Sequence, residues 1–232
     1  MIRFEDKELE NMVLAGESCI AVPFEIFIPS SGEPIITIYS FLKDVAEKFE
    51  SRFADDLLSA DALNWLDDQL SARVKDINYA HADDSSHHLL EYEADDCKIC
   101  LDENVLGKVL LVTENDFPKG LDLSYFEDYN VEQSTSALFL EDDKVVCVAT
   151  TNDTVFDDKS VEICVETLPG YEGRGFGTAT VAVLCSFYNK DNVKVKYECA
   201  KSNIASVKVA EKCGFSLKGE RYSYVCYAVE EE

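Results

Sequence analysis

The sequence predicts an α/β protein, because runs of strand-like alternation and runs of helical period follow one another along the 232 residues. Residues 161–167 alternate apolar and polar side chains and are rich in β-branched residues, which is typical of a strand. A glycine-rich segment follows. Apolar residues then recur at the spacing of one helix face, at Val181, Leu184, Cys185 and Tyr188.

The N-terminal part contains strands and helices of its own. Strand-like runs lie at residues 19–22, 24–28 and 35–39, and a Pro-Ser-Ser-Gly turn separates the last two. The pattern then becomes helical. One amphipathic helix is predicted from Phe41, Val45, Phe49, Phe53 and Leu57, and a second, beginning near Ser59 or Asp61, from Leu63, Leu66, Leu70 and Val74.

Residues 79–88 are polar and aperiodic, which predicts a loop, and strands are predicted at 89–93, 97–101 and 109–113. Two motifs here have the residue types of metal sites, His87-His88 and Cys97-Lys-Ile-Cys100. Adjacent side chains of a strand point to opposite faces, and the CxxC motif has no second pair nearby. We therefore interpret both motifs as structural and expect no metal.

The clearest pattern is in the C-terminal part. Residues 137–140 and 145–149 flank a short Glu-Asp-Asp-Lys turn, which predicts a β-hairpin. Beyond the glycine segment and its helix, a strand is predicted at 193–199 and a last strand at 222–228. Between them lies a helix that ends at Gly214 and has its apolar face at Ile204, Val207, Ala210 and Cys213.

The composition argues against several classes of function. The formal net charge is -25, from 46 acidic and 21 basic side chains, and such a surface repels nucleic acids and anionic lipids. No apolar run approaches the ~20 residues of a membrane span, and the charged N-terminus lacks the apolar stretch of a signal peptide. Nine scattered cysteines, an odd number, favour a reducing compartment. We expect a cytoplasmic protein without nucleic-acid or membrane partners.

The segment Glu172-Gly173-Arg174-Gly175-Phe176-Gly177-Thr178 lies between a predicted strand and a predicted helix. Glycine lets the backbone approach a ligand closely, and the first N–H groups of a helix have no partner within it. Such a turn is a favourable site for an anion. The sequence therefore predicts that a phosphate or pyrophosphate of a cofactor binds here.

Two segments resemble motifs of the GNAT superfamily of acetyl-CoA-dependent N-acetyltransferases. The first is the glycine segment, which in that family is usually [Gln/Arg]-x-x-Gly-x-[Gly/Ala] and binds the acyl-CoA pyrophosphate. The second is usually Asn-x-x-[Ala/Ser]-x-x-x-Tyr-x-Lys-x-Gly-Phe. Here it runs from Asn203 through Ser206, Ala210 and Lys212 to Gly214-Phe215 with matching spacing.

The resemblance covers residues 109–232, and it is closest to a subgroup with an additional N-terminal region. It implies a mixed, largely antiparallel sheet flanked by helices. Residues 109–232 are then the acetyl-CoA-binding catalytic core, and residues 1–108 an N-terminal α/β region of unknown role. The implied activity is that of an acyltransferase that moves the acetyl group of acetyl-CoA directly to a primary amine in a ternary complex, without a metal.

Two residues depart from the family pattern. Glu172 replaces the usual Gln or Arg, and a carboxylate beside a diphosphate weakens binding unless it points away. Ala210 occupies the position of the tyrosine that usually protonates the departing thiolate, so that acid is absent. Tyr222 and Tyr224 are predicted as replacements, with Cys199 or a water as alternatives.

The resemblance also predicts the other site residues. Glu162 resembles the general base that several family members carry on this strand, and Glu166 lies four residues on, on the same face of a regular strand. The thioester oxygen is expected at the backbone N–H near Val165. The predicted residues for acetyl-CoA binding are Val165, Thr167, Gly173, Arg174, Gly175, Phe176, Gly177, Thr178, Asn203 and Ser206.

The resemblance implies a primary amine as the acceptor, and the charge favours a cationic one, since a strongly acidic surface concentrates cations. We expect a cationic amine, either a small molecule or an amine of a protein; the oligomeric state cannot be predicted. One alternative is an acyl-CoA-binding pseudoenzyme or regulatory module, which Glu172 and Ala210 favour. A Rossmann-type nucleotide-binding domain fits poorly, because a hairpin precedes the glycines where a parallel β-α-β unit is needed.

Overall fold

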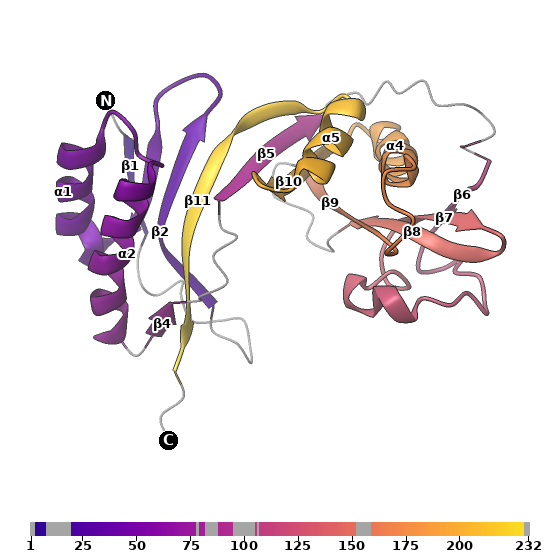
Figure 1. Cartoon of the computed structure of the whole chain (residues 1–232), viewed down its shortest axis with the longest axis horizontal. Coiled ribbons are helices and arrows are strands. Elements are labelled where there is room, and N and C mark those ends of the chain that lie inside the picture. Colours follow the sequence, from indigo (N-terminus) through magenta and orange to yellow (C-terminus); the bar gives the residue numbers. More distant parts are fainter. Residues whose placement is uncertain are drawn as a thin grey trace. The chain divides into compact units, whose positions relative to one another are not determined.

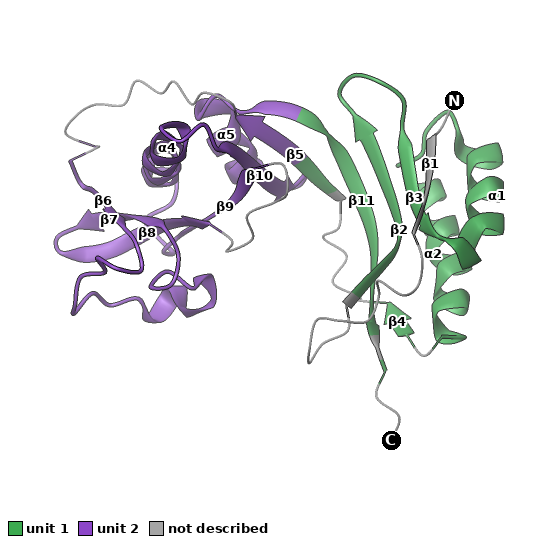
Figure 2. Cartoon of the chain, turned by 180° about the vertical axis from the view of Figure 1, so that it is seen from behind, with its two compact units in different colours: residues 1–90, 218–232 green, residues 91–217 purple. Residues whose placement is uncertain are grey.

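The computed structural model describes residues 3–7, 20–77, 79–81, 88–94, 105, 107–151 and 159–229. The chain forms two compact units, shown in Figure 2. The first comprises residues 1–90 and 218–232, and the second residues 91–217. The units divide at 90/91 and 217/218, so the C-terminal strand belongs with the N-terminal residues, and the functional division at 108/109 stays a prediction.

The first unit is a sheet with two helices, α1 (Lys43–Phe53) and α2 (Ala60–Lys75), side by side next to it (Figure 1). Its strand order is β1-β3-β2-β11, and β4 also pairs with β11. β1 runs parallel to β3, whereas β2 is antiparallel to both β3 and β11. The strands are β1 (Arg3–Lys7), β2 (Ile20–Pro29), β3 (Ile35–Tyr39), β4 (Tyr79–His81) and β11 (Ser216–Ala228), and a short 3₁₀ helix, η2 (Ser40–Leu42), precedes α1.

The predicted helix faces form the core of this unit, where Phe49 and Leu66 are fully buried with Phe24 of β2. Ser59 caps α2, because its side chain accepts a hydrogen bond from the Ala62 N–H. Three predictions were wrong in detail. Residues 20–22 and 24–28, predicted to lie in two strands, form one, α1 ends before the buried Leu57, and residues 79–81 of the predicted loop pair with β11 as β4.

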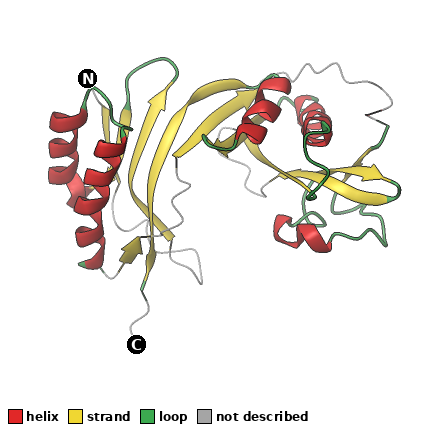
Figure 3. Ribbon diagram, viewed as in Figure 1, coloured by secondary structure: helices red, strands yellow, loops and turns green. Residues whose placement is uncertain are grey.

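The second unit contains the sheet β5-β10-β9-β8-β7-β6, which Figure 3 shows with its helices. β6 to β9 are successively antiparallel, whereas β10 runs parallel to β9 after the crossover helix α4. The mixed, largely antiparallel sheet is thereby confirmed. The elements are β5 (His88–Ala94), β6 (Val109–Val112), η3 (Ser124–Tyr129), β7 (Ser136–Glu141), β8 (Lys144–Thr151), β9 (Ser160–Thr167), α4 (Phe176–Asn189), β10 (Lys194–Ala200) and α5 (Ile204–Lys212).

Local signals explain these boundaries. The predicted hairpin turns at Asp142 and Asp143, whose φ angles of 51° and 63° match the right-handed twist of paired strands. Gly214, with φ 77°, follows the end of α5 as expected. The predicted strand at 97–101 and the Cys97/Cys100 motif lie outside the described residues, as does His87.

The described part of the chain has neither a membrane-spanning helix nor a cluster of metal-ligating side chains. No helix there is both long and apolar enough to cross a membrane. Nor do the described His, Cys, Asp and Glu side chains form a group of three or more placed to hold a metal ion.

Candidate active site

The central feature of the second unit is the partial separation of two parallel strands. β9 and β10 pair from Ser160↔Lys194 to Glu162↔Lys196, and both strands continue beyond these three residue pairs. On its other edge β9 stays paired with β8 as far as Thr167. The β10-side edge of β9 therefore presents backbone groups that an extended ligand can bind.

The glycine segment enters α4 in a conformation that suits an anion. Gly173 and Gly175 have φ angles of 72° and 86°, which residues with a Cβ rarely adopt. Gly175 is the N-cap of α4 and supplies no side-chain cap, and the first helical hydrogen bond runs from the Ala179 N–H to its carbonyl. The N–H groups of Phe176, Gly177 and Thr178 precede this bond, so they can bind an anion at the positive end of the helix.

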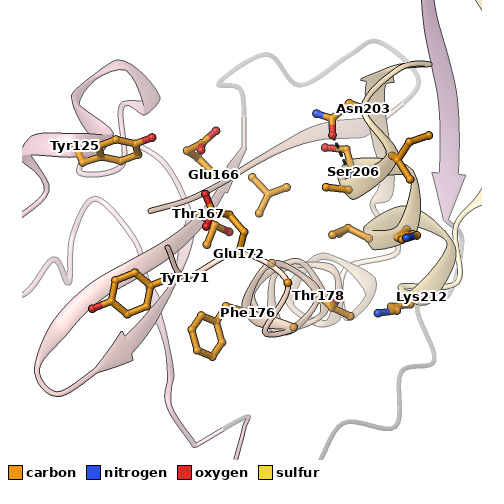
Figure 4. A pocket seen from close by; sticks show the side chains of 18 residues that line it. Tyr125, Glu166, Thr167, Tyr171, Glu172, Phe176, Thr178, Asn203, Ser206 and Lys212 are labelled. Atoms are coloured by element: carbon orange, nitrogen blue, oxygen red, sulfur yellow. Dashed lines mark hydrogen bonds between the residues drawn. The ribbon is translucent and has the colours of Figure 1, made fainter. Parts of the chain in front are cut away.

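These features open onto one cavity of about 590 Å³ (Figure 4), a size usual for ligand sites. Its wall comes from the end of β9, the glycine segment, the start of α4, α5 and one tyrosine of η3. The lining residues are Tyr125, Val165, Glu166, Thr167, Tyr171, Glu172, Gly173, Gly175, Phe176, Gly177, Thr178, Asn203, Ile204, Ala205, Ser206, Lys208, Val209 and Lys212.

All but one of the residues predicted to bind the cofactor lie on this wall. The exception is Arg174, whose guanidinium donates to both carboxylate oxygens of Glu141 at 2.8 and 2.6 Å. It also lies over the Phe176 ring, 4.7 Å from the centroid. The bidentate ion pair directs this side chain along the outside of the glycine turn.

Glu172 lines the cavity, but its carboxylate takes part in the turn. One oxygen accepts a hydrogen bond of 2.6 Å from the Gly170 N–H. The Gly170 N–H thus holds the Glu172 carboxylate, which stands where the family usually has Gln or Arg.

Asn203 and Thr167 likewise have structural partners. The Asn203 side-chain oxygen accepts from the Ser206 N–H at 3.1 Å and caps α5. The Thr167 hydroxyl donates to the buried Cys147 thiol at 3.2 Å. Burial raises the pKa of that thiol, so Cys147 remains a neutral part of the core. The Asn203 amide NH₂ is the group left to face a ligand.

The two predicted carboxylates have different surroundings. Glu166 lines the cavity, and one of its oxygens accepts a hydrogen bond from the Tyr129 hydroxyl at 3.1 Å. Glu162 is half-buried on the same strand, at the last residue pair with β10, and it is not part of the cavity wall. The end of β9, rather than its middle, therefore brings a carboxylate to the cavity.

Tyr222 and Tyr224 lie in the core of the first unit. The Tyr224 ring is fully buried and stacks on His81, with 4.1 Å between the ring centroids. Burial, together with nearby Asp67, raises the pKa of Tyr222 to about 12. Neither tyrosine is part of the cavity wall, and nor is Cys199, whose thiol pKa burial and Glu198 raise to about 11.

Sequence reasoning missed several residues of the wall. Lys208 and Lys212 are one helical turn apart on the exposed side of α5, a spacing that could have predicted a basic face toward the phosphates. Tyr125 has no such signal, because η3 is too short to show a period.

The fold and the cavity define a class of protein: an α/β domain in which a helix start without a side-chain cap and a separated strand pair border one cavity. Comparison with known families identifies it. The GNAT acetyltransferase family matches residues 65–227, most of the chain, so the chain belongs to this family. Membership supports acetyltransferase activity in general. The match begins inside the region that the sequence analysis set apart as N-terminal.

One of the solved structures that match the chain supports the fold. A GNAT-family protein from Novosphingobium aromaticivorans is 14% identical with a TM-score of 0.53, covering 66% of this chain and 69% of that one. An acetyltransferase from Colwellia psychrerythraea is 11% identical with a TM-score of 0.43, covering 63% and 57%. A GCN5-related N-acetyltransferase-like protein from Streptococcus suis is 15% identical with a TM-score of 0.41, covering 91% and 88%. No protein with a curated description matches the chain.

Proposed function

We propose that this protein is an acetyl-CoA-dependent N-acetyltransferase that acts on a cationic primary amine. The observation that carries the proposal is the start of α4, which has glycines in place of a side-chain cap and opens into the 590 Å³ cavity. Acetyl-CoA is typical of the family. The charge and the cysteine pattern support a cytoplasmic location.

The cavity residues fit an acyl-CoA donor. The N–H groups of residues 176–178 bind the pyrophosphate, and Lys208 and Lys212 on α5 supply positive charge beside it. The open edge of β9 near Val165 pairs with the amide groups of the pantetheine arm. The Asn203 NH₂ is a further donor for that arm.

The reaction requires that an ammonium group lose two protons as it becomes an amide. A carboxylate at the end of β9 accepts the first and passes it to solvent. The amine lone pair then attacks the thioester carbonyl, so that a C–N bond forms and the C–S bond breaks. The second proton goes to the leaving thiolate, which becomes the CoA thiol. A backbone N–H near Val165 stabilises the developing oxyanion.

The acid for the thiolate is the least demanding requirement, because a thiolate is a fair leaving group. Ala210, at the usual tyrosine position, is fully buried. Tyr222 and Tyr224 remain candidates from the sequence. A water in the cavity serves the same purpose without a dedicated side chain.

Calorimetry tests donor binding. Wild-type protein is expected to bind acetyl-CoA, and Gly175→Glu to abolish detectable binding, because it places a carboxylate at the anion site in a strained backbone position. Gly120→Glu is the matched control. Gly120 has φ 89° and open space around it, and it does not line the cavity. Equal affinity in both variants would contradict the proposal.

The second candidate function is an acyl-CoA-binding module without transferase activity, which Ala210 and Glu172 favour. Release of free CoA thiol in the presence of a panel of amines distinguishes the two. Turnover above the hydrolysis background supports the enzyme, whereas tight binding with no turnover supports the module.

A further inference from the structure

The charges on the cavity wall are separated in space. Glu166 and Glu172 are its two acidic residues among those described, and the Glu172 carboxylate accepts from Gly170 within its own turn. Glu166 is therefore the carboxylate that remains for a ligand. Figure 4 shows Tyr125 and Glu166 on one side of Thr167 and Lys212 on the other. If the phosphates of the donor bind near Lys212, a cationic acceptor can bind near Glu166, at the opposite side of the cavity.

Tyr129 holds the Glu166 carboxylate through a side-chain hydrogen bond. Its hydroxyl donates to Oε2 at 3.1 Å, a contact between residues 37 positions apart. A phenol has one proton to donate, and in the part of the chain that the structure describes this is the one hydrogen bond to the Glu166 carboxylate, whose backbone is paired with β8. Burial, followed by the charge of Glu166, raises the pKa of Tyr129 to about 12, so the phenol stays a donor at neutral pH.

The segment that carries Tyr129 is itself anchored. Phe126 of η3 is buried in the core of the second unit, and the Tyr129 ring packs against the same cluster. Asp122 accepts hydrogen bonds from the Ser124 N–H and hydroxyl at 3.1 and 2.8 Å, which fixes the start of η3. The same short element places the half-exposed ring of Tyr125 on the cavity wall.

We propose that Tyr129 is a positioning residue that holds Glu166 with one oxygen open to the cavity, and that Glu166 and the Tyr125 ring form the subsite for the acceptor's ammonium group. This inference rests on the proposed function and names its acceptor subsite. A primary ammonium donates to the open carboxylate oxygen and lies against the electron-rich face of the ring. Glu166, rather than Glu162, is then the catalytic residue that takes the first proton.

A binding experiment tests the subsite independently of turnover. The probe is n-butylammonium chloride, titrated by NMR into CoA-saturated protein, with neutral 1-butanol for comparison. Glu166→Gln is expected to weaken ammonium binding about tenfold or more, and Tyr129→Phe about three- to tenfold. Tyr188→Phe is the matched control, since it removes a phenol hydrogen bond of 3.2 Å to Thr151 in the same unit and away from the cavity wall.

A double-mutant cycle separates positioning from a merely structural role. In the Glu166→Gln background, Tyr129→Phe should change ammonium affinity less than about twofold, because the interaction that it supports is already gone. CoA affinity should match wild type in all these variants. Additive losses, or unchanged ammonium binding in Glu166→Gln, would overturn the inference. If the wild-type protein does not bind CoA, the result would instead overturn the proposed function.

Where an amine gives turnover, steady-state kinetics add a second readout. Glu166→Gln is expected to lower kcat about 10²-fold or more, and Tyr129→Phe to lower it less while the KM for acetyl-CoA stays unchanged. Glu162→Gln should lower kcat much less than Glu166→Gln does. A large loss in Glu162→Gln alone would assign the base to Glu162 and contradict this inference.

Discussion

Individual side chains in the site are held by partners that side-chain periodicity does not identify. Arg174, predicted to contact the cofactor, forms a bidentate pair with Glu141 and stacks on Phe176. Glu172, predicted to weaken phosphate binding, accepts from Gly170. In both cases a nearby partner of the right charge or hydrogen-bonding type determines where the side chain points.

At this scale, Arg174 and Lys212 should behave differently. Arg174→Gln is expected to lower the free energy of unfolding by about 0.5–1 kcal/mol, since the pair is partly exposed, and to change acetyl-CoA affinity little. Lys212→Gln, on the cavity wall, should weaken acetyl-CoA binding about three- to tenfold with little effect on stability. Urea denaturation and calorimetry measure both. If Arg174→Gln weakened acetyl-CoA binding and Lys212→Gln did not, Arg174 rather than Lys212 would be the phosphate contact.

The helices α4 and α5 of the second unit differ at their N-cap residues. The N-cap of α5 is Asn203, whose side chain accepts from the Ser206 N–H, whereas the N-cap of α4 is Gly175, which supplies no side-chain cap. A capped start satisfies its own N–H groups, and an uncapped start keeps them for a ligand.

Two substitutions at Asn203 separate its structural and binding contributions. Asn203→Ala removes the cap of α5 and should cost about 1 kcal/mol of unfolding free energy, whereas Asn203→Ser keeps a cap and should cost a few tenths at most. Both variants lack the amide NH₂, so both should bind acetyl-CoA more weakly if that group donates to the pantetheine arm. Wild-type affinity in Asn203→Ser would show that Asn203 serves the helix alone.

The whole molecule carries a formal net charge of -25, and this field acts on every ligand that approaches it. It would favour a cationic acceptor and oppose an anionic donor, and we expect the α4 start and the α5 lysines to compensate locally for the donor. Added salt weakens both effects, because it screens charges beyond about 8–10 Å.

The salt dependence of turnover follows. At saturating acetyl-CoA, kcat/KM for a cationic amine should fall several-fold between low and physiological salt, since steering of the cation weakens. Hydroxylamine, which is uncharged at neutral pH, is the control and should change much less. An equal response of the two acceptors would argue against electrostatic selection of cations.

The sequence by itself determined those parts of the site that local chemistry specifies. The strand predicted at 161–167 is found at 160–167, and the glycine turn, the helix after it and the helix that ends at Gly214 were also predicted. Side-chain period, positive φ at glycine and helix capping act within a few residues, so the local sequence contains enough information for them.

Only the tertiary structure decided which groups meet at the cavity. The separation of β9 from β10 leaves Glu166 on the wall and Glu162 off it. Tyr129 reaches Glu166 across 37 residues, and β11 joins the N-terminal strands of the first unit. These outcomes depend on strand register and on packing between distant segments, which local periodicity does not encode because it describes one element at a time.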